Sequence, residues 1–216
     1  LQARQGQYAP FLSYLQQYQL RHALTPSQVA DWLQVALWAG QDDEVVKVWR
    51  RYQVYMPLPA RGTAAAAQAL RNQKQWQTSL TLWQQALSQA PGSDDYRIGY
   101  IKTLADARKD GEALSEARRL VAEQASVAHL QTLSYVYLRL GKSWDQLLVD
   151  TQILDRDPQN KTALASLMAT LTRNRIDSPA LGLANSVELT PAEKRNLQLN
   201  AAAELVRLAD TPSREE

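Results

Sequence analysis

The sequence predicts an all-α protein in which helical hairpins stack into a right-handed superhelix with a C-terminal capping helix. Three observations carry this prediction. The 216 residues include only 8 glycines and 9 prolines, and 45% are hydrophobic, a composition typical of helical proteins. Apolar residues recur at the i, i+3, i+4 and i+7 spacing of an amphipathic helix. The pattern repeats every 34 residues, and a fixed period of this size indicates stacked helical units.

The clearest repeating unit spans residues 60–93. Its first half is rich in alanine and ends at Leu70, and a polar break follows. The second half places Leu80, Trp83 and Leu87 on one stripe of a helix. A shift of 34 residues in either direction places apolar residues on apolar residues. Each unit is therefore predicted to be a hairpin of two antiparallel helices.

Residues at the predicted helix boundaries support this register. Thr25 suits the N-cap of the first complete hairpin, because Pro26 follows it and Gln28 completes a capping box. Proline is expected to end the second helices, since it lacks the N–H that continues a helix. These prolines are Pro57, Pro91 and Pro158. The turn inside a unit is expected at equivalent positions, which are Gly6, Gly40 and Lys74.

The register divides the chain into four parts. Residues 1–25 are predicted to form a partial N-terminal repeat that lacks most of its first helix, and residues 26–161 to form four complete repeats. Residues 162–209 are predicted to form a degenerate repeat and a capping helix, which covers the apolar end of a stack. Residues 210–216 are expected to form a flexible tail. The complete hairpins are placed at residues 26–59, 60–93, 94–127 and 128–161.

Charge and motif content exclude several classes of function. The 24 basic and 22 acidic residues nearly balance, so no excess charge points to nucleic acid or to an anionic membrane. No apolar run reaches the roughly 18 residues of a membrane-spanning helix. The sequence has no cysteine and no nucleophile elbow, phosphate-binding glycine loop or His-Glu-x-x-His motif. We therefore expect no enzyme activity, no cofactor and no metal site, and place His22 and His129 at the surface or at helix caps.

Residues 60–93 resemble a tetratricopeptide repeat, with a small residue at position 20, alanine near position 27 and proline near position 32. Longer strings resemble one family in particular. They are ADWLQVALWAGQD (30–42), LPARG (58–62), QWQTSLTLWQQALS (75–88), ELVRL (204–208) and TPSR (211–214). These strings are similar to the N-terminal periplasmic region of bacterial outer-membrane exporters of poly-β-1,6-N-acetyl-D-glucosamine (the PgaA type).

The resemblance implies a location and a function. In that family the repeats precede a β-barrel that carries the polymer across the outer membrane, and they are thought to contact the polymer and a periplasmic deacetylase. The resemblance therefore implies a non-enzymatic periplasmic scaffold in biofilm polysaccharide export. It would bind the deacetylase, the partly deacetylated polymer, or both, and guide the polymer to the barrel, which is not expected within this sequence. The residues leave open an alternative, a generic peptide-binding repeat adaptor that recognises an acidic partner segment.

Repeat positions select the candidate binding residues. In tetratricopeptide proteins the inner groove is lined by positions 2, 5, 9, 12 and 13 of each first helix. His129, Thr170 and Arg173 occupy such positions as well. The candidates for binding are Gln34, Trp38, Arg61, Gln68, Arg71, Asn72, Asp95, Lys102, Asp106 and Arg139.

Two ligand chemistries fit these candidates. Trp38 is expected to offer its ring to a sugar, while Asp95 and Asp106 are the acids that would pair with glucosamine ammonium groups. Arg61, Arg71 and Lys102 would instead clamp an acidic peptide. The other five tryptophans occupy positions that pack one hairpin on the next, so they are predicted to lie in the core. They are Trp32, Trp49, Trp76, Trp83 and Trp144.

Overall fold

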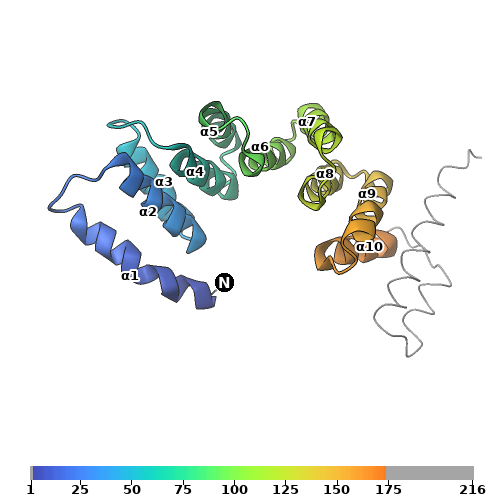
Figure 1. Cartoon of the computed structure of the whole chain (residues 1–216), viewed down its shortest axis with the longest axis horizontal. Helices are drawn as coiled ribbons and strands as arrows, with labels where there is room; N and C mark the ends of the chain where they lie inside the picture. The colour runs from blue at the N-terminus through green and yellow to red at the C-terminus, as the bar shows by residue number, and fades with distance from the viewer. Residues whose placement is uncertain (1, 174–216) are drawn as a thin grey trace, which may run out of the picture. The chain divides into compact units, whose positions relative to one another are not determined.

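The computed structural model describes residues 2–173, which contain ten α-helices and no strand (Figure 1). Contacts divide the chain into two compact units, Leu1–Lys109 and Asp110–Glu216. The helices of the first unit are α1 (Gln2–Tyr18), α2 (Pro26–Trp38), α3 (Asp42–Tyr52), α4 (Ala60–Asn72), α5 (Trp76–Gln89) and α6 (Asp94–Asp106). Those of the second unit are α7 (Asp110–Glu123), α8 (Val127–Leu140), α9 (Ser143–Arg156) and α10 (Lys161–Arg173).

Two helices fall within each of the four residue ranges that the repeat predicts. The all-α fold class is confirmed, whereas the division into domains stays a prediction. The expected capping helix and tail lie outside the described residues. Within residues 2–173, no helix is both long enough and apolar enough to cross a membrane.

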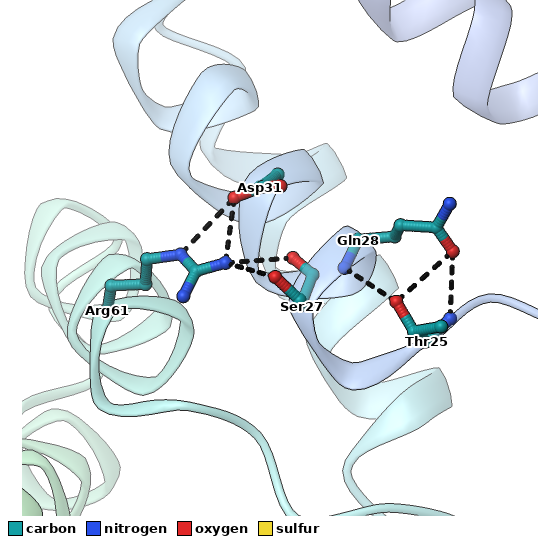
Figure 2. Close-up of polar contacts among 5 residues, drawn as sticks. All are labelled: Thr25, Ser27, Gln28, Asp31 and Arg61. Atoms are coloured by element: carbon teal, nitrogen blue, oxygen red, sulfur yellow. Dashed lines mark hydrogen bonds and ion pairs between the residues drawn. The ribbon is translucent and has the colours of Figure 1, made fainter.

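The start of α2 has the capping chemistry that the sequence predicts. The Thr25 backbone N–H donates to Oε1 of Gln28 at 2.9 Å, and the Gln28 backbone N–H donates to Oγ1 of Thr25 at 3.2 Å (Figure 2). Pro26 occupies the first turn of the helix, where its missing N–H would have no helical partner. The predicted capping box is therefore confirmed.

Left-handed residues mark the turns between helices at the period of the sequence. Gly40 and Lys74 have φ values of 74° and 61°, and both predicted turns are confirmed. Arg108 follows 34 residues after Lys74 with a φ of 60°, and Gly141 has a φ of 71°. A positive φ is uncommon outside glycine, so the repeat is imposed on the backbone even where the residue is a cation.

The turn predicted at Gly6 is wrong, because α1 runs without interruption from Gln2 to Tyr18. Pro10 also lies inside this helix, although proline usually breaks a helix. Leu12 and Leu15 on α1 are buried in the core of the first unit. Their burial favours one continuous helix, and tertiary packing overrides the weak local preference of glycine for a turn.

Alanines bring the helices of the first unit close together. A Cβ added to Gly62 on α4 would lie 3.0 Å from Cβ of Ala30 on α2, so these two helices approach closely. On the other side of α4, Ser79 of α5 is buried and its Oγ donates to the Ala67 carbonyl at 2.7 Å. The alanine-rich segment therefore serves as the packing surface for both neighbouring helices.

A buried polar cluster joins the three helices α8, α9 and α10 of the second unit. Asp150 on α9 accepts from Oγ of Ser134 on α8 and from Oγ of Ser166 on α10, each at 2.6 Å. Nε2 of Gln146 donates to Oγ of Ser166 at 2.6 Å. Burial raises the pKa of the Asp150 carboxyl, while the two serine hydrogen bonds act in the opposite direction.

The tryptophans divide between core and surface. Trp32, Trp49 and Trp83 are buried, as predicted, and Trp76 is half-buried. The prediction is wrong for Trp144, whose exposed fraction is 42%. Trp144 lies in the first turn of α9, and the buried residues of that helix begin only after it.

Candidate functional site

Nine of the ten candidate residues lie in the first unit, and Arg139 lies exposed on α8 of the second unit. The structure places the nine in several separate groups, in which candidate residues contact each other or nearby polar residues. The predicted groove is therefore less open to a ligand than the sequence suggests. His129 is not a groove residue, because it is buried and its Nδ1 lies 2.6 Å from the Gln124 carbonyl oxygen.

Trp38 is the most exposed aromatic candidate. It is the last residue of α2, and its exposed fraction is 55%. The ring of Tyr8 on α1 lies 6.2 Å from it, centroid to centroid, at an angle of 41°. Gln34 lies one turn before Trp38 and is half-buried, so both lie on one side of α2. We call Tyr8, Gln34 and Trp38 the Trp38 surface.

The sequence analysis missed Tyr8, and one signal was available. Two helices joined by a short connection run antiparallel, so the first half of α1 lies beside the end of α2. Tyr8 also packs against the core of the unit. It therefore fixes one side of the indole while the rest of the ring of Trp38 stays open to solvent.

Arg61 connects α4 to α2 rather than projecting freely. Its Nε and Nη2 donate to Oδ1 of Asp31 at 3.2 and 2.9 Å, and Nη2 also donates to Oγ of Ser27 at 2.7 Å (Figure 2). Both side chains of the ion pair are well exposed, so solvent screens the attraction and its energy is small. The contact nevertheless fixes the orientation of the guanidinium group.

Arg71, Lys102 and Asp106 form a second group, which we call the Arg71 cluster. Nε of Arg71 on α4 donates to Oδ2 of Asp106 on α6 at 2.7 Å. The two side chains are only 15% and 8% exposed. Burial and the Arg71 charge lower the pKa of the Lys102 ammonium group, while Asp106 acts in the opposite direction. Asp106, predicted to bind an ammonium group of a ligand, is thus paired inside the unit.

Gln68 and Asn72 lead to an acidic hollow. Nε2 of Gln68 donates to Oδ1 of Asn72 at 2.9 Å, and Nδ2 of Asn72 donates to both carboxylate oxygens of Asp42 at 3.2 and 3.1 Å. The hollow has a volume of about 550 Å³ and is lined by Gly40, Gln41, Asp42, Asp43, Glu44 and Gln73. Its acids lie in the first turn of α3, where they also stabilise the helix dipole.

The arrangement suits binding by surface side chains. Asp95 lies exposed in the first turn of α6. Among the residues described, no three His, Cys, Asp or Glu side chains gather as metal ligands would. What the candidates offer is one open aromatic ring, amide side chains and exposed carboxylates, which are groups that bind polar polymers through stacking and hydrogen bonds.

Solved structures with a similar fold come from one protein. The chain matches the "MamA RS-1 ArsTM double mutant" with a TM-score of 0.56 and 15% identity, covering 87% of this chain and 97% of that one. It matches "MamA 41-end from Desulfovibrio magneticus RS-1" with the same TM-score and identity, covering 86% and 97%. MamA is a tetratricopeptide-like helical repeat protein. At this identity the likeness shows the fold alone.

Comparison of sequences gives a relationship that is specific. No protein-family model matches the chain. All 216 residues align at 41% identity with the poly-beta-1,6-N-acetyl-D-glucosamine export proteins of Escherichia coli K12 and of Escherichia coli O157:H7. The chain spans 25% of the length of these relatives. It is therefore homologous, along its whole length, to a quarter of the poly-β-1,6-N-acetyl-D-glucosamine export proteins, and the resemblance indicated by its sequence is confirmed.

Proposed function

We propose that this chain is a non-enzymatic, periplasmic helical-repeat scaffold that takes part in the export of poly-β-1,6-N-acetyl-D-glucosamine. The observation that carries the proposal is the 41% identity over the whole chain to proteins named for that export. An alignment without interruption in coverage supports a shared role for this segment and not only a shared fold. The all-helical structure, with polar and aromatic side chains on its surface, fits a binding role.

The Trp38 surface is the part of the chain that we propose to contact the polymer. A pyranose ring has faces of C–H groups, which pack on an aromatic ring, and an edge of hydroxyl and amide groups, which need hydrogen-bond partners. Trp38 supplies the exposed ring, and Gln34 supplies an amide one helical turn away. Tyr8 holds the indole on one side, which lowers the entropy that ordering the ring would cost.

Glucosamine residues of a partly deacetylated polymer carry ammonium groups, so carboxylates should lie near the path. Asp95 is exposed and is the predicted acid that supports this role. Asp106 supports it less well, because its carboxylate pairs with Arg71 in a site that is mostly closed to solvent. We therefore assign ammonium recognition to Asp95 and a structural role to Asp106.

The second partner that we propose is the periplasmic polysaccharide deacetylase. Helical repeats present extended surfaces to proteins, and a scaffold that holds the deacetylase would bring its product to the export path. The alternative, an adaptor for an acidic peptide, is supported less well. Two of the three cations that it needs, Arg61 and Arg71, already contact carboxylates of the same unit.

Binding of defined β-1,6-linked oligomers, partly deacetylated, tests the polymer contact by isothermal titration calorimetry. We expect Trp38→Ala to weaken binding about tenfold, the effect of truncating an aromatic anchor. Trp144→Ala is the matched control, because Trp144 is also exposed but lies in the other unit. Equal losses in both variants, or no loss in Trp38→Ala, would count against the Trp38 surface.

A second titration, with the deacetylase in place of the oligomer, tests the protein contact. Binding of the deacetylase without binding of oligomers would make the chain a docking module for that enzyme. An acidic peptide that binds more tightly than either, with steep dependence on salt, would favour the adaptor instead.

A further inference from the structure

A separate pocket lies at the end of α1. Its volume is about 380 Å³, within the range of small-ligand sites. Tyr18 lies ten residues after Tyr8 on the same helix, which corresponds to about 15 Å along the axis, so this pocket is distinct from the Trp38 surface. The residues that line it are Tyr14, Gln17, Tyr18, Leu20, Arg21 and His22. We call it the Tyr14 pocket.

Aromatic rings form a short row along one wall of the Tyr14 pocket. The rings of Tyr18 and His22 stack at 4.3 Å between centroids with an angle of 19°. Tyr14 continues the row at 5.7 Å from Tyr18, with 59% of the residue exposed. Nδ1 of His22 lies 3.3 Å from the Tyr18 carbonyl oxygen. The row is therefore held from its C-terminal end, and Tyr14 presents a ring to solvent.

The other lining residues indicate what kind of ligand fits. Gln17 and Arg21 offer hydrogen bonds at the edge of the pocket, and Leu20 is an exposed apolar side chain. The lining includes the cation Arg21 and no carboxylate. An ammonium group would be repelled here, whereas a neutral acetamide would find a hydrogen-bond donor for its oxygen and an apolar contact for its methyl group.

We propose that the Tyr14 pocket binds a neutral N-acetylhexosamine residue of the polymer and selects acetylated over deacetylated residues. The proposal rests on the proposed function, because it takes the polymer as the ligand. It adds a division of labour between two places on one unit. The exposed acid Asp95 serves the deacetylated residues, and the Tyr14 pocket serves the acetylated ones.

The experiment is a heteronuclear NMR titration of the full 216-residue chain with two β-1,6-linked oligomers of equal length, one fully acetylated and one fully deacetylated. The acetylated oligomer should shift the signals of Tyr14, Tyr18 and His22 in a saturable way. Tyr14→Ala should weaken that binding about tenfold. Tyr55→Ala, a change at a more exposed tyrosine outside the pocket, should leave it unaltered.

Reversal of charge gives a readout that a structural role would not produce. Arg21→Glu should shift the preference of the pocket toward the deacetylated oligomer, while far-UV circular dichroism stays the same. The inference is overturned if the acetylated oligomer leaves these signals unmoved, or if Arg21→Glu weakens both oligomers equally. Binding at Trp38 with a silent Tyr14 pocket would refute the pocket and leave the proposed function intact. Silence at both places would refute polymer binding as well.

Discussion

Replacing Gly99 by alanine tests how tightly α5 and α6 pack. A Cβ at this position would lie 2.5 Å from Cζ2 and 2.9 Å from Cε2 of Trp83, far inside the ~3.5–4.0 Å at which carbon atoms attract. The indole cannot turn aside without loss, because it is buried and its Nε1–H donates to Oγ1 of Thr103 at 3.0 Å. Oγ1 of Thr103 in turn donates to the Gly99 carbonyl at 2.7 Å.

The magnitude follows from three opposing contributions. Alanine in place of glycine inside a helix gains about 1 kcal/mol. Overpacking costs about 1–3 kcal/mol, and loss of the Trp83–Thr103 hydrogen bond costs about 1 kcal/mol more. The free energy of unfolding should therefore fall by about 1–3 kcal/mol.

Urea denaturation followed by tryptophan fluorescence and circular dichroism measures this loss. Gly111→Ala is the control, because no heavy atom lies within 4 Å of a Cβ there, and it should not lower the midpoint. A Gly99→Ala variant as stable as Gly111→Ala would refute the described contact between Trp83 and α6.

Three further changes test other parts of the account. Asp106→Ala leaves Arg71 without its carboxylate in a mostly buried site, so the free energy of unfolding should fall by about 3 kcal/mol in chemical denaturation. Thr25→Ala removes the N-cap of α2 and should cost about 1 kcal/mol by the same assay. Because burial raises the pKa of Asp150 in the folded state, its contribution to stability is present at acid pH and is lost as pH rises through that pKa. Asp150→Asn should therefore flatten the pH dependence of the melting temperature, and an unchanged profile would contradict the role of burial.

The sequence predicted the helices well because their signals are local. The 34-residue period places the turns at Gly40 and Lys74, and the capping box at Thr25 needs only four consecutive residues. The turn at Gly6 failed because the repeat register was extended into a segment that the core holds as one helix. Trp144 failed because a stripe position at a helix end need not meet a neighbouring helix.

The candidate site was harder to predict, for a physical reason. Groove positions of successive first helices lie side by side, so opposite charges placed there pair with each other before any ligand does. Arg71 and Asp106 stand 35 residues apart, and Arg61 and Asp31 stand 30 apart. A search for opposite charges about one repeat apart would have found both pairs. Tyr8 required knowledge of how α1 packs, which no repeat position supplied.

The central claim is that this chain contacts the exported polymer through Trp38. The most direct measurement is an NMR titration of the unmodified chain with a partly deacetylated β-1,6-linked oligomer, following the indole Nε1–H signal of Trp38. The account predicts a saturable shift of that signal, with the buried indoles of Trp32 and Trp83 unaffected. An indole signal of Trp38 that stays in place while oligomer is added to saturating concentration would contradict it.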